Sequence, residues 1–260
     1  MARAAVIAVQ LYTLRTLLDD PARVSGVLAR LGEIGYEAVE VAGLGAGVPD
    51  RFGDELRRSG LTACAVHAGL DRLTQELDRV IEECRQWGCE YVVVPSVPRS
   101  YHSGEGFRRF AAEASELAGR LREHGLRLAY HNHAYELERF DGKTGLETLL
   151  AAAGADVLDA ELDTYWLQFG GADPATWIRR YKGRVPLVHL KDMAVRRGDP
   201  VDAVIGEGNL DWTEILSACR DAGTRWLVVE QDNPEGDPLE AVAGSFRNLE
   251  RLMSGEGVRR

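Results

Sequence analysis

Short apolar runs rich in Val, Ile and Leu alternate along the chain with longer stretches in which apolar residues recur every three or four positions. The first pattern is typical of strands buried on both faces, and the second is typical of amphipathic helices. Eight strand–helix pairs follow one another, beginning with a strand. The predicted strands cover residues 4–12, 36–43, 61–69, 89–97, 126–134, 157–166, 185–193 and 225–232.

A helix follows each predicted strand, and glycine stands at the C-terminal end of nearly every helix, where a positive φ is favoured before the next strand. The predicted helices cover residues 20–34, 49–60, 72–88, 106–125, 144–154, 175–183, 211–223 and 238–253. Eight such units in 260 residues match a single-domain (β/α)8 TIM barrel, of the α/β class, over residues 1–260. A doubly wound open sheet is the alternative, but it usually carries a glycine-rich loop after its first strand. The segment QLYTLRTLL contains no glycine.

Composition narrows the class of protein. The formal net charge of -10 argues against binding to nucleic acid, which needs a basic surface. The apolar runs are shorter than the roughly 18 to 20 residues of a membrane span, so we expect a soluble cytoplasmic protein without a membrane partner. Cys64, Cys84, Cys89 and Cys219 form no C-x-x-C pair, and we expect them to be buried reduced thiols.

Candidate metal ligands gather at the ends of four consecutive predicted strands. In a barrel of this type the active site lies at the C-terminal ends of the strands. Each group alone has a structural explanation, such as a hydrogen-bonded histidine or a helix cap, but four adjacent strands make a metal site the better interpretation. Mixed oxygen and imidazole donors suit Mn²⁺, Mg²⁺, Co²⁺ or Zn²⁺, whereas structural zinc favours thiolates. The candidates are His131, His133, Glu136, Glu161, Asp163, His189, Glu230 and Asp232.

Several other polar and aromatic residues near predicted strand ends are candidates for substrate binding. An aromatic ring there can stack on a sugar face, although core packing explains Tyr12 and Trp166 equally well. The loop of residues 206–211 contains two glycines, which suits either backbone contacts to a phosphate or a turn before a helix. The candidate substrate contacts are Gln10, Tyr12, His67, His131, Asn132 and Trp166.

Seven segments in this order resemble the xylose isomerase-like barrel superfamily of sugar phosphate isomerases and epimerases, near inosose dehydratase and the keto-sugar hydratases. The resemblance runs from about Val6 to Glu230, and the combination is more specific than any single motif. The segments are VQLYTLR, YEAVEVAG, YHNHAYELE, LDTYW followed by GGADPATW, VHLKD, IGEGNLDW and WLVVEQD.

The resemblance implies a divalent metal held by Glu, Asp, His and Glu from the fifth to eighth strands. Asp163, His189 and Glu230 match the last three. The fifth strand departs from the pattern, because His131 stands where a glutamate is common. We favour Glu136, reaching back from just beyond the strand, as the first ligand, with His131 as the alternative.

The activity implied is isomerisation or epimerisation of a ketose, a polyol-derived ketone or a sugar phosphate through an enediolate. His133 is then a proton carrier, Lys191 stabilises oxyanion charge, and Glu230 acts as ligand and base. A hydro-lyase acting on an inosose or 3-keto-sugar is an alternative that the HNH sequence favours, and a non-catalytic barrel subunit is another. An abasic-site endonuclease would need more histidines and a basic face. Barrels of this type often pair, so a homo-oligomer is a further expectation.

Overall fold

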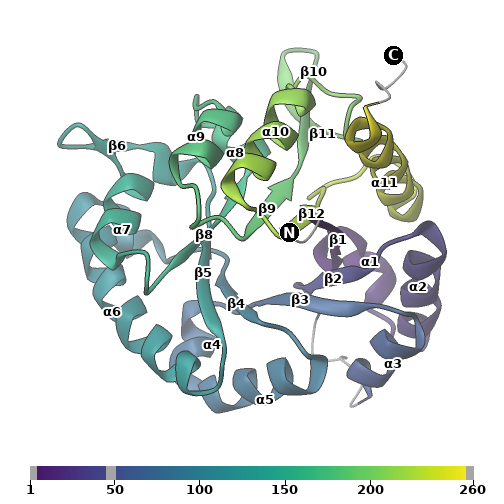
Figure 1. The fold of residues 1–260 in the computed structure, drawn as a ribbon, viewed down its shortest axis with the longest axis horizontal. Helices are drawn as coiled ribbons and strands as arrows, with labels where there is room; N and C mark the ends of the chain where they lie inside the picture. Colours follow the sequence, from purple (N-terminus) through teal and green to yellow (C-terminus); the bar gives the residue numbers. More distant parts are fainter. Residues whose placement is uncertain (1–4, 45–50, 256–260) are drawn as a thin grey trace.

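Eight parallel strands close into a barrel in a computed structural model that describes residues 5–44 and 51–255 (Figure 1). Their order around the barrel is β1-β12-β9-β8-β5-β4-β3-β2, which confirms the predicted (β/α)8 fold. The strands are β1 (Val6–Gln10), β2 (Ala38–Val41), β3 (Thr62–His67), β4 (Tyr91–Val94), β5 (Arg127–His131), β8 (Asp159–Asp163), β9 (Leu187–Leu190) and β12 (Trp226–Val229). Residue 4 of the first predicted strand and residues 49 and 50 of the second predicted helix lie outside the described residues.

Helices surround the barrel, as the ring of coiled ribbons in Figure 1 shows. Side chains cap several of them, and Thr144 with Glu147 forms a capping box at the start of α7. At the other end, Gly35 follows α2 with a φ of 118°, a conformation that suits glycine. The helices are α1 (Arg15–Leu18), α2 (Pro21–Ile34), α3 (Phe52–Arg58), α4 (Leu70–Gln75), α5 (Leu77–Trp87), α6 (Gly104–Glu123), α7 (Gly145–Ala153), α8 (Thr164–Phe169), α9 (Pro174–Arg180), α10 (Trp212–Ala222) and α11 (Pro238–Ser254).

Two hairpins that the sequence pattern did not reveal extend from the barrel. They are β6 (Arg139–Phe140) with β7 (Lys143–Thr144), and β10 (Asp192–Arg196) with β11 (Asp199–Ala203). Both turn through two residues with positive φ, Asp141–Gly142 and Arg197–Gly198. Such turns match the twist of antiparallel strands. The strands are short and partly exposed, so they lack the apolar run by which the barrel strands were recognised.

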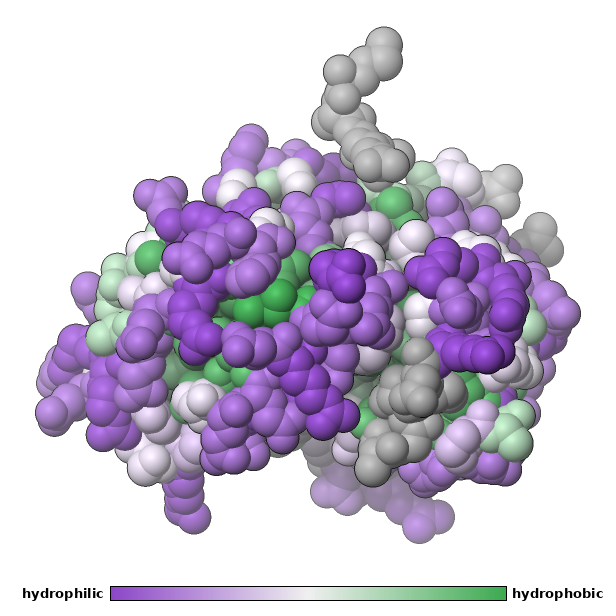
Figure 2. All heavy atoms as spheres, turned by 90° about the horizontal axis from the view of Figure 1, so that it is seen from below, coloured by the Kyte–Doolittle hydropathy of each residue, from purple (hydrophilic) through white to green (hydrophobic). Residues whose placement is uncertain are grey.

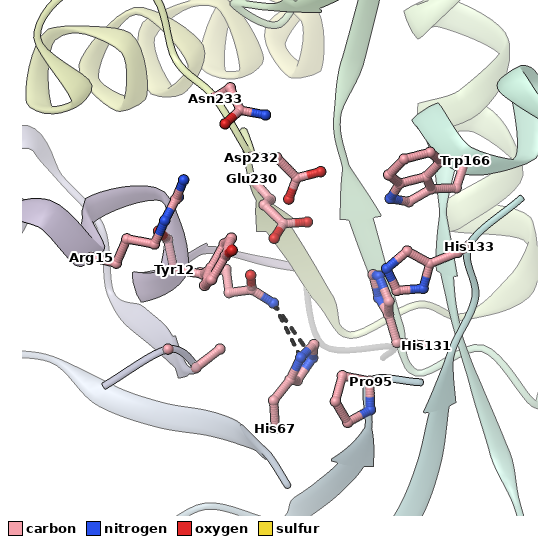
Figure 3. Close-up of a pocket in the computed structure, with 13 residues that line it drawn as sticks. Tyr12, Arg15, His67, Pro95, His131, His133, Trp166, Glu230, Asp232 and Asn233 are labelled. Carbon is pink, nitrogen blue, oxygen red and sulfur yellow. Dashed lines mark hydrogen bonds between the residues drawn. The ribbon is translucent and has the colours of Figure 1, made fainter. Parts of the chain in front are cut away.

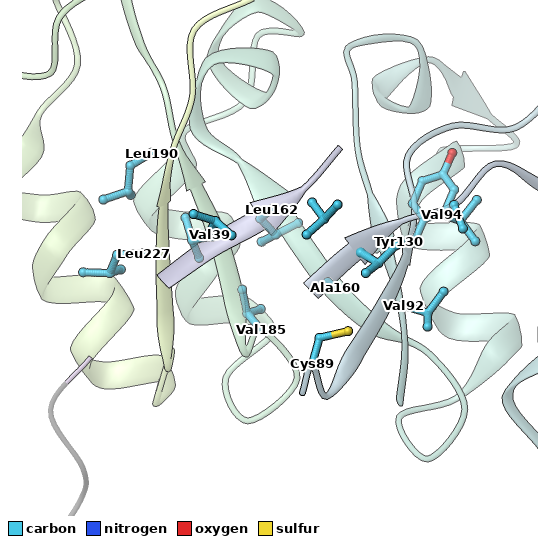
Figure 4. Close-up of a cluster of buried hydrophobic side chains, with 14 of the residues drawn as sticks. Val39, Cys89, Val92, Val94, Tyr130, Ala160, Leu162, Val185, Leu190 and Leu227 are labelled. Carbon is cyan, nitrogen blue, oxygen red and sulfur yellow. The ribbon is translucent and has the colours of Figure 1, made fainter. Parts of the chain in front are cut away.

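Two hydrophobic layers hold the barrel together. The larger one packs the outward faces of the strands against the helices, with Val39 and Leu162 among its members (Figure 4). The smaller one fills the barrel itself, where Tyr91 and Trp226 begin their strands and so lie at the N-terminal end. Alanines occupy the middle of β1, β3 and β5 and the start of β2. Bulky rings therefore close one end, and small side chains leave room above them.

The surface agrees with the charged composition. Figure 2 shows a face dominated by hydrophilic side chains, with hydrophobic atoms visible mainly at the bottom of hollows. Among the described residues, no helix is both long enough and apolar enough to cross a membrane. All four cysteines are buried free thiols, as the sequence predicted.

One buried carboxylate, Asp192, organises the loop between β11 and α10. It accepts hydrogen bonds from the backbone N–H groups of Gly206 (2.8 Å) and Gly208 (3.0 Å) and from Nε1 of Trp212 (2.7 Å). The Leu210 N–H adds a longer bond at 3.3 Å. A side chain on Gly208 would collide with this carboxylate, since a Cβ there would lie 2.3 Å from Asp192 Oδ1. The sequence analysis offered two interpretations of loop 206–211, a phosphate contact or a turn before a helix. In the structure the loop leads directly into α10, which agrees with the turn.

We expect Asp192→Ala to lower the free energy of unfolding by about 3 to 5 kcal/mol, because several buried donors would lose their acceptor together. Urea denaturation followed by circular dichroism measures this. The matched control is Asp199→Ala on the same hairpin, where the side chain is exposed. That change should cost less than about 0.5 kcal/mol. Equal effects of the two substitutions would contradict the role given to Asp192.

Candidate active site

A cavity of about 540 Å³ opens where the barrel strands end (Figure 3). Its size lies within the ordinary range for small-molecule sites. Five of the six predicted substrate contacts line it, together with the predicted catalytic residues His133 and Glu230. Those five are Gln10, Tyr12, His67, His131 and Trp166.

Four buried residues converge beside this cavity with donor atoms within 4.8 Å of one another: His131, Asp163, His189 and Glu230. They come from β5, β8, β9 and the residue after β12. His189 Nδ1 lies 2.9 Å from Glu230 Oε2 and 3.9 Å from Asp163 Oδ2. His131 Nε2 also lies 3.9 Å from Asp163 Oδ2.

Asp163 serves two purposes within this group. Its Oδ1 accepts the N–H of Trp166 at 2.8 Å and so caps α8. Its Oδ2 is buried and has no hydrogen-bond partner within the described chain. Such an oxygen is costly to bury, and it faces two imidazole nitrogens and the Glu230 carboxylate. Two carboxylate oxygens and two imidazole nitrogens suit a divalent first-row ion, so the residues fit a metal.

Glu136 does not join this group, although the sequence analysis favoured it as a ligand. Its Oε1 accepts the hydroxyl of Tyr130 at 2.7 Å, and its Oε2 accepts the backbone N–H of His133 at 2.9 Å. Tyr130 belongs to the outer hydrophobic layer between strands and helices. The Glu136 carboxylate is therefore held at the back of β5. His131, the alternative, points into the barrel.

Below the first group lies a second set of polar side chains that meet inside the barrel. Glu40 Oε2 lies 2.7 Å from both Gln10 Nε2 and His189 Nε2. Glu161 Oε2 lies 2.9 Å from His67 Nε2 and 3.2 Å from His131 Nδ1. Sequence reasoning missed Glu40, although a carboxylate in the apolar run AVEV, on the same side of β2 as Ala38, was a usable signal.

His133 lies at the cavity with its ring 5.3 Å from that of Trp166, between ring centroids. Its Nδ1 is buried without a hydrogen-bond partner in the described chain. Burial lowers the pKa of His133 to about 4, so the ring is neutral near pH 7 and carries one N–H. His133 lines the cavity, so its ring can contact a molecule bound there.

Lys191 is fully buried behind these groups. Its Nζ contacts the Asp232 carboxylate and lies 3.7 Å from Glu230 Oε2. It also lies 5.3 Å from the ring centres of Tyr165 and Trp166. Burial alone would lower the pKa of Lys191, but Glu230 and the other nearby carboxylates raise it. The ammonium stays charged, and its contacts hold the side chains of Glu230 and Asp232 in position beside the cavity.

Asn132 is a predicted substrate contact that does not line the cavity. Its Oδ1 accepts the backbone N–H of Asp163 at 3.1 Å, and its Nδ2 donates to the His133 carbonyl at 3.3 Å. It ties β5 to β8 and positions Asp163. Conversely, Arg15 and Asn233 line the cavity, although they follow the strand ends by several residues and no pattern singled them out.

Burial and neighbouring charges act in opposite directions on the carboxylates. Burial alone would raise the pKa of Glu230 and of Glu161, but nearby cationic groups, Lys191 and His189 foremost, hold the Glu230 value at about 2. His189 and His67 do the same for Glu161, also to about 2, against the repulsion of Glu40. Burial wins at Asp163 and raises its pKa to about 7. The cationic groups of the protein near Asp163 are therefore too few to offset the effect of burial on its pKa.

Comparison with known proteins agrees with this architecture. Residues 28–252 match the family model described as xylose isomerase-like TIM barrel. The chain is 31% identical to the rhizopine catabolism protein MocC of Rhizobium meliloti over 60% of its own length and 53% of that protein, so the match spans about half of this relative. It is 25% identical to the inosose dehydratase of Geobacillus kaustophilus over 87% of this chain and 86% of that one.

Among solved structures, one described as the IolI protein with a zinc atom superposes with a TM-score of 0.71 at 17% identity. The superposition covers 98% of this chain and 100% of the other. At this identity the likeness shows the shared fold.

Glu230 and Glu136 allow a matched test of the metal ligands, because Glu230 belongs to the group of convergent donors and Glu136 does not. We expect Glu230→Gln to weaken Zn²⁺ binding by more than about 100-fold, because it removes a charged donor from the group. Glu136→Gln should change it less than about threefold, since an amide can accept from His133 and donate to Tyr130 where the carboxylate now accepts twice. Competition with a chromophoric chelator measures both. Strong loss in Glu136→Gln with little loss in Glu230→Gln would reverse the assignment.

Proposed function

Because the chain belongs to the xylose isomerase-like TIM barrel family, we propose that it is a metal-dependent enzyme that removes the proton beside the carbonyl of a keto-polyol and then expels a neighbouring hydroxyl as water. The observation that carries this proposal is the pairing of a carboxylate, Glu230, with a neutral imidazole, His133, in one cavity. The similarity to inosose dehydratase over most of both chains supports the same reaction class.

The metal would be held by His131, Asp163, His189 and Glu230. A bound divalent ion supplies positive charge that stabilises the negative charge developing on the carbonyl oxygen as the proton leaves. The imidazole tautomers are prepared for this by the lower set of side chains. Glu40 accepts from Nε2 of His189 and Glu161 accepts from Nδ1 of His131, which leaves the other nitrogen of each ring free as a donor atom.

The remaining steps belong to the chain's own residues. Glu230 takes the proton from carbon, and its lowered pKa means that the carboxylate is ionised and able to accept it. The N–H of His133 hydrogen-bonds to the leaving hydroxyl and passes it a proton as the other ring nitrogen takes up the proton that Glu230 removed from carbon, so water leaves and both side chains return to their starting states. Trp166 and Tyr12 flank the cavity with rings that can stack on the substrate. Lys191 contacts Asp232 and helps to keep Glu230 ionised.

The substrate that this cavity suits carries no phosphate. Of the basic side chains near its lining, the Arg15 guanidinium donates to the Tyr12 carbonyl at 2.9 Å and stacks on the Tyr12 ring. Lys191 is engaged by Asp232. The glycine loop donates its amides to Asp192. Besides Arg15, the acidic and basic residues that line the cavity are Glu230, Asp232 and three histidines, so hydroxyl groups are better partners than a dianion.

Isomerisation or epimerisation is the second candidate, and the family that the chain belongs to favours it. Both reactions share the first proton removal. They differ in the next step, because an epimerase must return a proton to the opposite face of the carbon, and a hydro-lyase must protonate a hydroxyl. The position of His133 beside the cavity decides for the hydro-lyase in our proposal. A non-catalytic barrel would have no use for the four convergent ligands.

We expect His133→Ala to slow loss of water by about 10² to 10⁴-fold while exchange of the proton beside the carbonyl with D₂O continues, since general acid catalysis contributes about that much. Glu230→Gln should abolish both. Mass spectrometry of a cyclic inosose and an open-chain ketose incubated with metal-loaded enzyme in D₂O separates the two steps.

The control variant is His124→Ala, which changes an exposed histidine at the end of α6 and should retain both rates. Deuterium incorporation by the unaltered enzyme without any loss of water would replace the hydro-lyase by the isomerase or epimerase. Neither exchange nor water loss on any substrate would reject both candidates.

A further inference from the structure

The lower set of side chains contains a group that takes no direct part in the proposed proton transfers: Glu40, His67 and Glu161. Glu161 stands two residues before Asp163 on β8, so it shares the inward face and lies one layer deeper in the barrel. Glu40 comes from β2, and His67 ends β3. The two carboxylates are completely buried, and the His67 side chain is nine-tenths buried. None of the three belongs to the first ligand group.

Donor atoms crowd together in this group. Glu161 Oε2 has His67 Nε2 at 2.9 Å and His189 Nε2 at 3.2 Å. Glu40 Oε2 has the same two nitrogens at 3.1 Å and 2.7 Å. Donor atoms at about 2.0 to 2.1 Å from a tetrahedral zinc ion lie roughly 3.4 Å from one another. The spacing here is close to that of ligands that surround one ion. His67 and Glu161 belong to a group with His131 and His189 whose donor atoms all lie within 4.8 Å of one another, and Glu40 adjoins this group through its contacts with His67 and His189.

Hydrogen bonds do not satisfy this cluster. An imidazole nitrogen can donate one hydrogen, yet His67 Nε2 and His189 Nε2 each face both carboxylates. In addition, Oε1 of Glu40 and Oε1 of Glu161 are buried with no hydrogen-bond partner among the described residues. Two fully buried side chains therefore each present an oxygen that lacks a protein donor, and a buried oxygen of this kind is costly.

Charge leads to the same conclusion. Glu40 and Glu161 lie against the imidazole rings of His67 and His189, and among the described residues neither carboxylate has a lysine or arginine partner. Buried carboxylates without such a partner suit a bound cation.

We propose that Glu40, His67 and Glu161 bind a second divalent cation, deeper in the barrel than the first. Two carboxylates and one imidazole select Mn²⁺, Co²⁺ or Zn²⁺ by the same donor chemistry. The rings of His131 and His189 lie between the two sites and present one nitrogen to each. The second site does not depend on which reaction the cavity performs.

Metal stoichiometry tests this directly. Metal-free full-length protein is titrated with Co²⁺, bound ions are counted by elemental analysis after gel filtration, and the absorption of bound Co²⁺ is followed. We expect two ions per chain in the unaltered protein and one in both His67→Ala and Asp163→Asn, each variant losing a different ion. The control His124→Ala should retain two. With Mn²⁺, two ions this close should broaden each other's electron paramagnetic resonance signal, and this broadening should vanish in either variant.

One ion per chain in the unaltered protein, unchanged by His67→Ala, would overturn the second site and leave the proposed function intact. One ion that His67→Ala removes and Asp163→Asn spares would instead place the metal in the deeper site and remove the basis of the proposed function. Circular dichroism checks that each variant is folded. Glu161→Gln, which keeps the side-chain shape, replaces His67→Ala if that variant does not fold, and it should likewise reduce two ions to one.

Discussion

Carboxylates buried inside the barrel need cationic or hydrogen-bonding partners there. This requirement determines how the side chains are arranged at the C-terminal ends of the barrel strands. Glu40, Glu161 and Asp163 are completely shielded from solvent, and Glu230 is nearly so. An isolated carboxylate in such surroundings would cost many kcal/mol or take up a proton. Every imidazole that reaches the barrel interior accordingly lies against at least one of these groups within the described chain, except His133, which faces the cavity.

The lower half of the barrel makes this arrangement possible. Most TIM barrels fill their interior with layers of branched aliphatic side chains. Here Tyr91 and Trp226 close the N-terminal end, and the next layer contains Ala8, Ala38 and Ala129. Small side chains in that layer leave volume for the rings and carboxylates nearer the C-terminal ends of the strands. The position of the polar site therefore depends on the packing of the apolar core.

Much of this was predictable from sequence, and the failures have physical causes. The barrel followed from eight apolar runs. Asp163, His189 and Glu230 were candidates because they lie at the ends of predicted strands, and the resemblance to the family singled them out as ligands, which stays a prediction. Glu136 lies in a 3-10 turn after β5 has ended, where alternation no longer applies, and its carboxylate turned to the outer layer.

Glu40 was missed for a different reason. The carboxylate in the apolar run AVEV marks an unusual position, but the sequence does not show which side chains it meets, because its partners His67 and His189 lie 27 and 149 residues away. Such a contact exists only once the barrel closes.

The histidine at position 131 has a consequence for both charge and chemistry. With a carboxylate there, the first ligand group would carry three negative charges. With His131 it carries two, from Asp163 and Glu230, which one divalent ion balances. The same substitution leaves Glu230 as the carboxylate of that group that also lines the cavity. Asp163, the other carboxylate of the group, does not line the cavity, so only His133 and Glu230 are placed there to exchange protons with a substrate in the proposed reaction. A histidine at position 131 is therefore consistent with the proposed loss of water.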